Sequence, residues 1–261
     1  MKNIFSIKSL LAVLYFLGGL ALMGGIWEFI SWCTKNEIPS PRMTWVVFKE
    51  VMQNPMQDDP DYKGIGIKLI SSLKRVGIGF GLGSLLAIPV GMLMGSRKII
   101  MNIVNPMVQI LRPVSPLAWF PLGLAIFQDS PKASIFMIFI CSLWPTLINT
   151  AFGVSHIPQD HKNVGKAFGF SRWKYITKIT VPYTLPHILT GLRLSIGVAW
   201  MVIVAGEMLS GGMGLGYFVW EEGFNGGSVA KIIVAIIIIG IVGLMLDRIF
   251  MALQKRFSYA V

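Results

Sequence analysis

The chain has 261 residues, of which 54% are hydrophobic and 13% charged, and its formal net charge is +11 at pH 7. A soluble domain of this length needs more charge to cover its surface, whereas a surface that faces lipid must be apolar. The composition therefore excludes a soluble globular protein and predicts a chain that crosses a membrane several times. Excess Lys and Arg in cytoplasmic loops explains the positive balance, so it does not indicate nucleic-acid binding.

Six apolar segments are long enough to cross a hydrocarbon core, which takes about 17 to 25 helical residues. We expect spans at residues 9–32, 67–95, 102–127, 132–154, 187–210 and 229–253. The first is read as a span rather than a signal peptide, because no small-residue cleavage site follows it at the usual distance. The predicted fold class is an all-α integral membrane protein. Residues 1–66 would hold the first span and an external polar segment, and residues 67–261 a core of five spans.

The third segment cannot form one straight helix. Its sequence NPMVQILRPVSPLAWFPLGLAIF has prolines at positions 106, 113, 116 and 121. Each interior proline removes a backbone hydrogen bond, which a bilayer tolerates only where protein or a water-filled cavity satisfies the freed groups. Broken helices often contribute to the substrate site of a transporter. Ser115 and Trp119 are therefore candidate pathway residues, the alternative being that the prolines only shape helix packing.

Basic residues predict the orientation, because cytoplasmic loops carry an excess of Lys and Arg. The largest excess lies in residues 155–186, between the fourth and fifth spans. Its charged residues are Lys162, Lys166, Arg172, Lys174 and Lys178, against Asp160. We therefore expect this loop and both termini in the cytoplasm, and the polar segment 34–66 outside.

Three basic residues conflict with that orientation, because they fall near the external start of the second span. They are Lys68, Lys74 and Arg75. Long basic side chains near a helix end can extend to the membrane surface, which is the structural explanation. The alternative is that they line the outer mouth of a pathway for anions.

Of the further ionisable residues within the spans, where a charge usually faces protein or water, four are candidate substrate contacts. They are Arg112, Arg193, Glu207 and Asp247. Extension to the membrane surface or pairing with a charge nearby in the sequence accounts for Arg193 and Asp247. Glu207 lies near the outer end of the fifth span, where an acid would repel an anion. We therefore assign Glu207, together with Arg75, a gating or structural role.

The basic loop resembles the cytoplasmic signature of bacterial ABC-importer permeases. That signature reads Glu-Ala-Ala, three residues, glycine, nine residues, isoleucine, one residue and Leu-Pro. Gly169, Ile179 and Pro182 keep the spacing, while Val181 replaces the leucine. The Glu-Ala-Ala positions are occupied by Asn163, Val164 and Gly165. Gly169 would let two short helices meet at a sharp bend and a partner approach the backbone; the alternative is a solvated amphipathic connector.

The resemblance extends from about Ser71 to the C-terminal helix. Its landmarks are SLKRVGIGFGLGSLLAIPVGMLMG, LRPVSPLAWFPLGLAIF, FMIFICSLWPTLINT and LPHILTGLRLSIGVAWMVIVAGEMLSGGMGLGYFVWEEGFN. In this order they resemble the nitrate/sulfonate/bicarbonate family of importer permeases. Within that family, RPVSPLAWFPLGLA, IFICSLWPTLINT, IPQD and GLGYFVWEE are most similar to permeases for nitrate, nitrite, cyanate or bicarbonate.

The resemblance implies a type I ABC-importer permease of the bacterial inner membrane. It implies a second permease copy, two cytoplasmic ATPase subunits and an external or lipid-anchored solute-binding protein. We expect no catalytic residue, metal or cofactor in this chain, with ATP and Mg²⁺ on the partner ATPases, because no G-x-x-x-x-G-K-[ST] loop occurs. The residues that would insert into a groove of the ATPase are Asn163, Val164, Gly165, Lys166, Ala167, Phe168, Gly169 and Phe170.

A small oxyanion also needs neutral donors, because a strongly cationic site would hold it and stop transport. The candidates are Ser115, Asn149, Thr150 and Trp200, whose hydroxyl, amide and indole groups offer directed hydrogen bonds. Together with Arg112 and Trp119 they form the predicted substrate pathway. Each of the four could instead pair helices within the bundle.

The sequence thus predicts a permease subunit that imports a small inorganic anion, most readily nitrate or nitrite, by ATP-driven alternating access. Bicarbonate or cyanate, and then alkanesulfonates such as taurine, are the alternatives within the family. A secondary anion transporter or channel is the alternative from another class, although no clear inverted repeat or deep ion-coupling carboxylate occurs. A membrane enzyme is disfavoured, because His156, His161 and His187 lack the spacing of a metal site.

Overall fold

The computed structural model describes residues 7–59, 63–224 and 227–257, and its regular secondary structure there is helical. The elements in chain order are α1 Ile7–Cys33, α2 Pro41–Val51, α3 Ile65–Ser96, α4 Lys98–Leu111, α5 Pro116–Phe127, α6 Ser130–Ser155, α7 Gln159–Ala167, α8 Arg172–Tyr175, the π-helical η1 Ile176–Thr180, α9 Val181–Ser210, α10 Leu215–Phe224 and α11 Val229–Phe257. Five helices are long and apolar enough to cross a membrane, or six if α4 and α5 count as one broken span. The expectation of about six spans is confirmed in this form.

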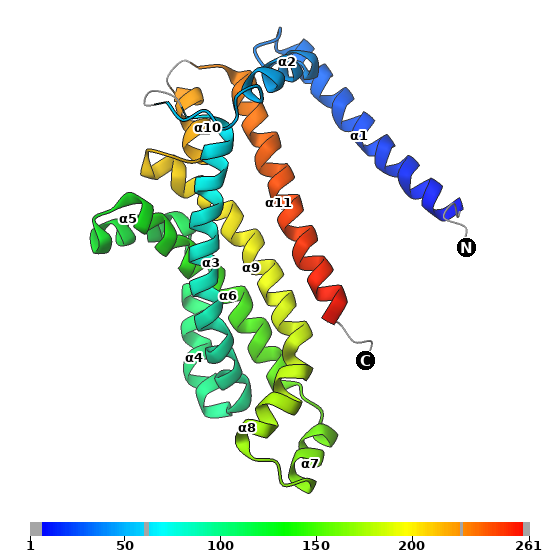
Figure 1. Ribbon diagram of the computed structural model, residues 1–261, viewed down its shortest axis with the longest axis vertical. Helices are drawn as coiled ribbons and strands as arrows, with labels where there is room; N and C mark the ends of the chain where they lie inside the picture. The colour runs from blue at the N-terminus through cyan, green and yellow to red at the C-terminus, as the bar shows by residue number, and fades with distance from the viewer. Residues whose placement is uncertain (1–6, 60–62, 225–226, 258–261) are drawn as a thin grey trace.

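Helices α3, α6 and α9 form the centre of a long bundle (Figure 1). α7 and α8 lie at one end of it, and α2 and α10 lie at the other. α1 projects away from the bundle and contacts the neighbouring α2. α2 in turn packs against α11, so the polar segment after the first span is a structured cap rather than an open loop.

Small residues recur at every fourth position along the face of α3 that meets α6. They are Gly79, Gly83, Ala87, Gly91 and Gly95. A Cβ atom at Gly91 would lie 2.7 Å from the backbone oxygen of Leu147, and the side chain of Ala87 is fully buried. The two backbones therefore touch along most of their length. Since lipid gives no hydrophobic drive to helix association, this close van der Waals contact is what holds α3 on α6.

α6 and α9 meet through a hydroxyl that repairs a proline break. Pro145 interrupts the hydrogen-bond ladder of α6, and the next residue, Thr146, donates its backbone N–H to Ser195 Oγ on α9 at 3.1 Å. Ser195 Oγ in turn donates to the backbone oxygen of Ser142. The α9 hydroxyl thus bridges the backbone N–H of Thr146 and the carbonyl of Ser142, so both groups of α6 have a hydrogen-bond partner, as a helix in lipid requires.

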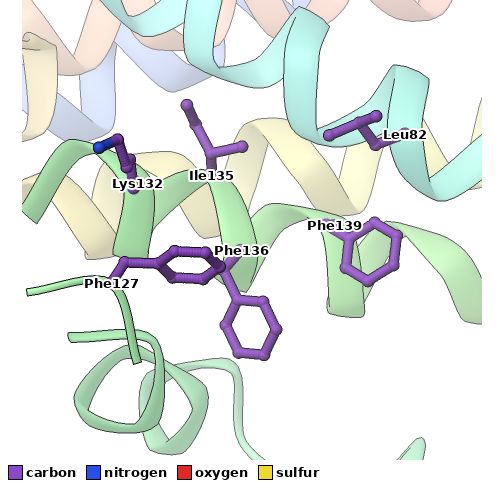
Figure 2. A pocket seen from close by; sticks show the side chains of 6 residues that line it. All are labelled: Leu82, Phe127, Lys132, Ile135, Phe136 and Phe139. Atoms are coloured by element: carbon purple, nitrogen blue, oxygen red, sulfur yellow. The ribbon is translucent and has the colours of Figure 1, made fainter. Parts of the chain in front are cut away.

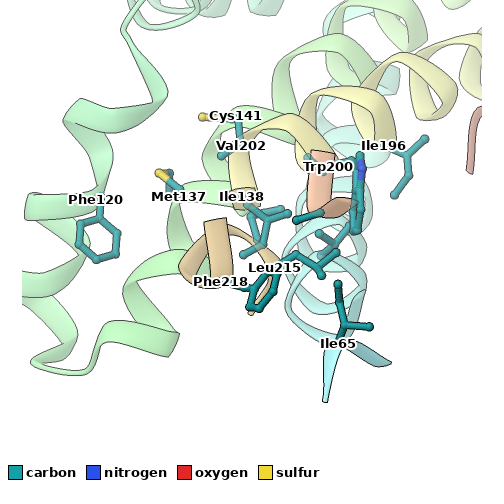
Figure 3. Packing of buried hydrophobic residues seen from close by; sticks show 14 of the residues in the cluster. Ile65, Phe120, Met137, Ile138, Cys141, Ile196, Trp200, Val202, Leu215 and Phe218 are labelled. Carbon is teal, nitrogen blue, oxygen red and sulfur yellow. The ribbon is translucent and has the colours of Figure 1, made fainter. Parts of the chain in front are cut away.

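One hydrophobic cluster fills the space between these helices at the α10 end (Figure 3). Met137 and Ile138 of α6 and Ile203 of α9 belong to it, and Leu215 and Phe218 bring α10 into the same cluster. All five side chains are almost completely buried. α10 is therefore held inside the bundle end rather than on its surface.

The third predicted span is broken, as its prolines indicate, and the break is a corner of 99° between α4 and α5. Ser115 is extended (φ −55°, ψ 132°), the conformation that the following Pro116 favours. α5 consequently leaves the bundle sideways (Figure 1). One span over 102–127 is thus corrected to two half-length helices at a right angle.

The fifth predicted span is longer than expected, because the helix does not begin at residue 187. α8, η1 and α9 form one continuous helical run of 39 residues, Arg172–Ser210. Pro182 would normally end a helix by clashing with the carbonyl of Lys178. The wider π-turn removes that clash, and Val181 donates its N–H to Ile176 O, five residues back.

The contact of α3 with α6 predicts that Gly91→Leu destabilises the bundle, because the new side chain meets backbone atoms that cannot move aside. We expect the free energy of unfolding to fall by at least about 2 kcal/mol. Gly81→Leu on the same helix is the control, since a Cβ there meets nothing within 4 Å, and its change should stay under about 0.5 kcal/mol. Unfolding in mixed detergent micelles, followed by circular dichroism, measures both. Equal losses would contradict the packing assignment.

Candidate functional site

The segment at the α7 end, residues 159–175, is a helix–turn–helix and is called the coupling segment below. α7 ends in a Schellman motif: Phe170 N–H donates to Gly165 O at 2.9 Å, and Gly169 N–H to Lys166 O at 3.0 Å. Gly169 takes the left-handed φ of +58° that this motif requires. Ser171 then caps α8, its Oγ accepting from Lys174 N–H at 3.3 Å. The expected sharp bend at Gly169 is confirmed.

A small apolar cluster fixes the coupling segment to the bundle. Ile157 and Ile179 are buried in it, and Tyr175 packs against them. Gly165 lies against the ring of Tyr175 so closely that a Cβ atom there would be 2.7 Å from the ring. Tyr183 of α9 donates its hydroxyl to His156 O at 3.1 Å, which closes the loop before α7. The segment is thus a rigid extension of α6 and α9.

The outer surface of the coupling segment is apolar with a basic rim. The Phe168 side chain is 73% exposed, and Val164, one turn earlier on α7, is also exposed. Lys166 lies between them in the sequence, and the Lys174 ammonium lies over the Phe170 ring, 4.7 Å from its centre. An exposed apolar patch with a charged rim is typical of a protein interface. Of the predicted coupling residues, Gly165 is buried, Phe170 is half-buried, and Asn163, Val164, Lys166, Ala167, Phe168 and Gly169 are exposed.

A buried carboxylate ties several elements together at the opposite, α10 end. Glu207 of α9 is fully buried. Ser72 Oγ of α3 donates to it at 2.8 Å, Arg75 Nη1 at 3.0 Å and the Gly216 backbone N–H at 3.0 Å. These four residues and Leu215, whose N–H donates to Ser72 Oγ at 3.1 Å, are called the Glu207 cluster. The cluster joins α3, α9 and the start of α10.

The chain before α10 passes directly over this carboxylate. Gly214 has a φ of +154°, and a Cβ atom there would lie 2.1 Å from the Glu207 carboxyl carbon. Arg75 Nη1 also donates to the backbone oxygen of Met213 at 2.7 Å. The sequence indicated Glu207 and Arg75 but missed Ser72 and the glycines. The glycine-rich run SGGMGLG after α9 was the available signal for a close backbone approach.

The expectation that the basic residues of α3 extend to the membrane surface is wrong for two of the three. Lys68 is buried and pairs with Glu221 of α10 at 3.3 Å, with its ammonium 4.5 Å from the centre of the Phe218 ring. Arg75 pairs with Glu207, as described above. Lys74 is exposed. The acids that neutralise Lys68 and Arg75 lie more than 130 residues away in the chain, so sequence proximity did not reveal them.

Arg193 and Asp247 form a pair that joins α9 to α11. Arg193 Nε donates to Asp247 Oδ1 at 2.6 Å, and Nη2 donates to Oδ2 at 2.8 Å. This two-pronged geometry is the strong form of a charged hydrogen bond. It accounts for both residues as structural, through a partner in another helix rather than through the neighbouring Arg248.

The predicted pathway residues fall into two groups. Arg112 and Ser115 are exposed and lie together at the corner between α4 and α5. The others lie within helix packing: Trp119 is half-buried against the large core, Asn149 Nδ2 donates to Pro145 O at 2.8 Å, Thr150 is fully buried, and Trp200 Nε1 donates to Ile239 O at 2.9 Å. The structure therefore brings together only Arg112 and Ser115 at an accessible surface.

An apolar groove of about 370 Å³ lies beside α5 and α6 (Figure 2). It is lined by Leu82, Phe127, Lys132, Ile135, Phe136 and Phe139. Three phenyl rings and two aliphatic side chains give it almost no polar surface. Lys132 is the one lining side chain that can donate hydrogen bonds, and no second donor side chain stands beside it to hold an oxyanion, so we do not assign the groove to the substrate pathway.

Comparison with known proteins shows the class of this chain. Residues 87–259 match the family described as binding-protein-dependent transport system inner membrane component. The chain belongs to this family of permease subunits. Among solved structures, the MetNI methionine ABC transporter in an inward-facing conformation matches with a TM-score of 0.62 at 14% identity, over 73% of this chain and 94% of that chain. The fold is that of a type I ABC-importer permease.

Curated relatives cover most of the chain. A nitrate import permease protein, NrtB, of Synechocystis sp. is 39% identical over 237 residues, which are 90% of this chain and 86% of the relative. NrtB of Leptolyngbya laminosa is 44% identical over 204 residues, 76% of this chain and 73% of the relative. A bicarbonate transport system permease protein, CmpB, of Synechococcus elongatus is 40% identical over 234 residues, 88% of this chain and 84% of the relative.

The Glu207 cluster predicts that Glu207→Ala is strongly destabilising, because it leaves the largely enclosed Arg75 guanidinium, whose side chain is 13% exposed, without a counter-charge. We expect a loss of about 3–5 kcal/mol in the free energy of unfolding. Asp58→Ala is the control, since Asp58 and its partner Lys63 are 66% and 32% exposed, and it should cost less than about 1 kcal/mol. Unfolding in mixed micelles measures both. A loss at Glu207 no larger than at Asp58 would show that the cluster does not hold the α10 end together.

Proposed function

We propose that this chain is the membrane subunit through which an ABC importer moves a small inorganic anion, with nitrate or nitrite as substrate. The observation that carries this proposal is the similarity to nitrate import permeases over up to 90% of the chain. Bicarbonate is the second candidate, because the bicarbonate permease of Synechococcus elongatus is similar to a comparable degree.

Other subunits complete the proposed importer. A second copy of this chain forms the pathway with the first, and an external or lipid-anchored solute-binding protein delivers the anion. Two cytoplasmic ATPase subunits bind ATP and Mg²⁺ and dock on the coupling segments, one on each copy. Both termini and the coupling segment lie in the cytoplasm, in agreement with the basic residues of residues 155–186.

The coupling segment supplies the docking surface. The ring of Phe168 stands out from the segment beside Gly169, whose missing side chain leaves open space within 4 Å. Such a ring can fill a pocket of a partner while the backbone next to it makes close contact. The basic side chains around this patch orient the ATPase subunit as it approaches the coupling segment.

The helix after the coupling segment transmits the motion. From Arg172 to Ser210 the chain is one unbroken helical run, so a displacement of the coupling segment moves α9 along its whole length. Glu207 lies in the last turn of this run and binds α3 and α10. Closure of the ATPases on ATP therefore shifts α9 against α3 and α10 and opens the pathway at the α10 end, where the anion enters. ATP hydrolysis then returns the pathway to the state that is open toward the cytoplasm.

Docking at Gly169 is tested by Gly169→Trp in the assembled complex. An indole at this exposed turn should abolish substrate-stimulated ATP hydrolysis while the helices stay folded. The left-handed φ adds about 1–3 kcal/mol of local strain, which must be separated from the steric effect. Gly169→Asn is the matched control, because asparagine tolerates this conformation and is small; it should keep most of the stimulated rate. Full stimulated activity in the tryptophan variant would contradict the assignment.

The substrate is tested by measuring ATP hydrolysis of the reconstituted complex, with its ATPases and solute-binding protein, in nitrate, nitrite, bicarbonate, cyanate and taurine. Stimulation by nitrate or nitrite and not by the other anions is the expected result. Stimulation by bicarbonate instead moves the assignment to the second candidate. Purification without any associated ATPase would overturn the proposed importer.

A further inference from the structure

Helix α4 presents three different faces along its length. The first packs into the bundle through Met101, Val104 and the buried Val108. The second is apolar and exposed, and consists of Ile99, Ile103, Met107 and Ile110. The third is polar and exposed, and consists of Asn102, Asn105, Gln109 and Arg112. Spacings of three, four and three residues place these four on one side of the helix.

The polar face lies at the depth of the hydrocarbon core. α4 begins immediately after α3 ends, at the α7 end of the bundle, and its 14 residues extend about 20 Å toward the other end. A hydrocarbon core is about 30 Å thick. Amide and guanidinium groups at this depth cannot face lipid, so they face water or another protein chain. The exposed isoleucines on the second face are suited to lipid.

The end of the polar face opens into a cleft of about 510 Å³ between α4 and α6. Its polar lining is Asn105, Gln109 and Arg112, and its apolar lining is Val108, Pro113 and Ile148. This composition differs from that of the apolar groove in Figure 2. The cleft offers two amide N–H₂ groups and a guanidinium to one ligand.

Arg112 is not neutralised within the part of the chain that the structure describes. Arg75 of α3 and Arg193 of α9 each donate to a carboxylate within 3.0 Å. No carboxylate of the described residues lies within 4.0 Å of Arg112. Its positive charge is therefore available to an anion that enters the cleft.

We propose that Asn105, Gln109 and Arg112 form a transient binding site for a small monovalent oxyanion inside the permease. The proposal rests on the proposed function for the class of substrate. The guanidinium supplies the counter-charge and two parallel N–H groups that match two oxygens of a planar anion. The amides add donors without charge. Because the site is open and has a single cation, it holds the anion weakly, and the anion leaves again toward the α7 end.

The site is tested by removing the positive charge at position 112 and then restoring it chemically in the same folded protein. Arg112→Cys is made in a Cys33→Ser background, since Cys33 is exposed and Cys141 is buried. We expect nitrate uptake into proteoliposomes of the complete importer to fall at least 10-fold. Reaction with a trimethylammonium-ethyl thiosulfonate should restore at least a third of it, whereas a sulfonatoethyl reagent of similar size should restore none. Arg112→Lys should likewise keep at least a third of the uptake.

Lys98→Cys is the matched control, because it removes the same charge from the other end of α4, outside the cleft. It should transport at the parental rate before and after either reagent. Parental uptake by Arg112→Cys overturns the site, and so does a loss that neither the cationic reagent nor Arg112→Lys restores. Equal rescue by the anionic reagent overturns it as well.

The two proposals fail in different ways. If the parental importer carries bicarbonate and not nitrate, the substrate assignment fails, and the same rescue measured with bicarbonate still tests the site. If the parental importer carries nitrate and Arg112→Cys does so equally well, the substrate assignment stands and the site is wrong.

Discussion

The backbone contact between α3 and α6 is the constraint on which the rest of the structure depends. In lipid, helices gain little from burying apolar surface against one another, so association requires close packing and satisfied polar groups. Glycine and alanine at every fourth position of α3 provide the packing. With α3 and α6 in contact, α9 packs against both of them, and its Ser195 hydroxyl completes the backbone of α6 beside Pro145. The other helices are attached to this centre.

Some charges within the bundle join two helices, and others have no carboxylate partner among the described residues and can bind a ligand. Arg75 with Glu207 and Arg193 with Asp247 each join two helices by a neutralised pair. The Arg75–Glu207 pair is the enclosed one, with side chains 13% and 0% exposed, so its charges depend on each other most strongly. Arg112 differs, since it stands at an exposed corner with amide groups beside it. The same residue type is thus structural at two positions and suited to an anion at the third.

The continuous helix from Arg172 to Ser210 connects the two ends of the molecule. At one end it begins within the coupling segment, and at the other it carries Glu207. The π-turn before Pro182 preserves this continuity, which a regular α-helix would lose at that residue. An unbroken helix of this length can carry a displacement from one end of the bundle to the other without a chain of small side-chain movements.

The sequence by itself determined the class of the protein, the approximate positions of its spans, the break at Pro113 and Pro116, and the bend at Gly169. These follow from local properties: apolar length, missing N–H groups and the conformational freedom of glycine. It did not reveal the partners of Lys68, Arg75 and Arg193, because each partner lies more than 50 residues away and only packing brings it near. Nor did it show that Thr150 and Trp200 lie inside helix contacts while Arg112 opens on a cleft. A polar residue in an apolar segment has the same local signature in both places, and only the tertiary structure decides which face of the helix meets protein and which meets open space.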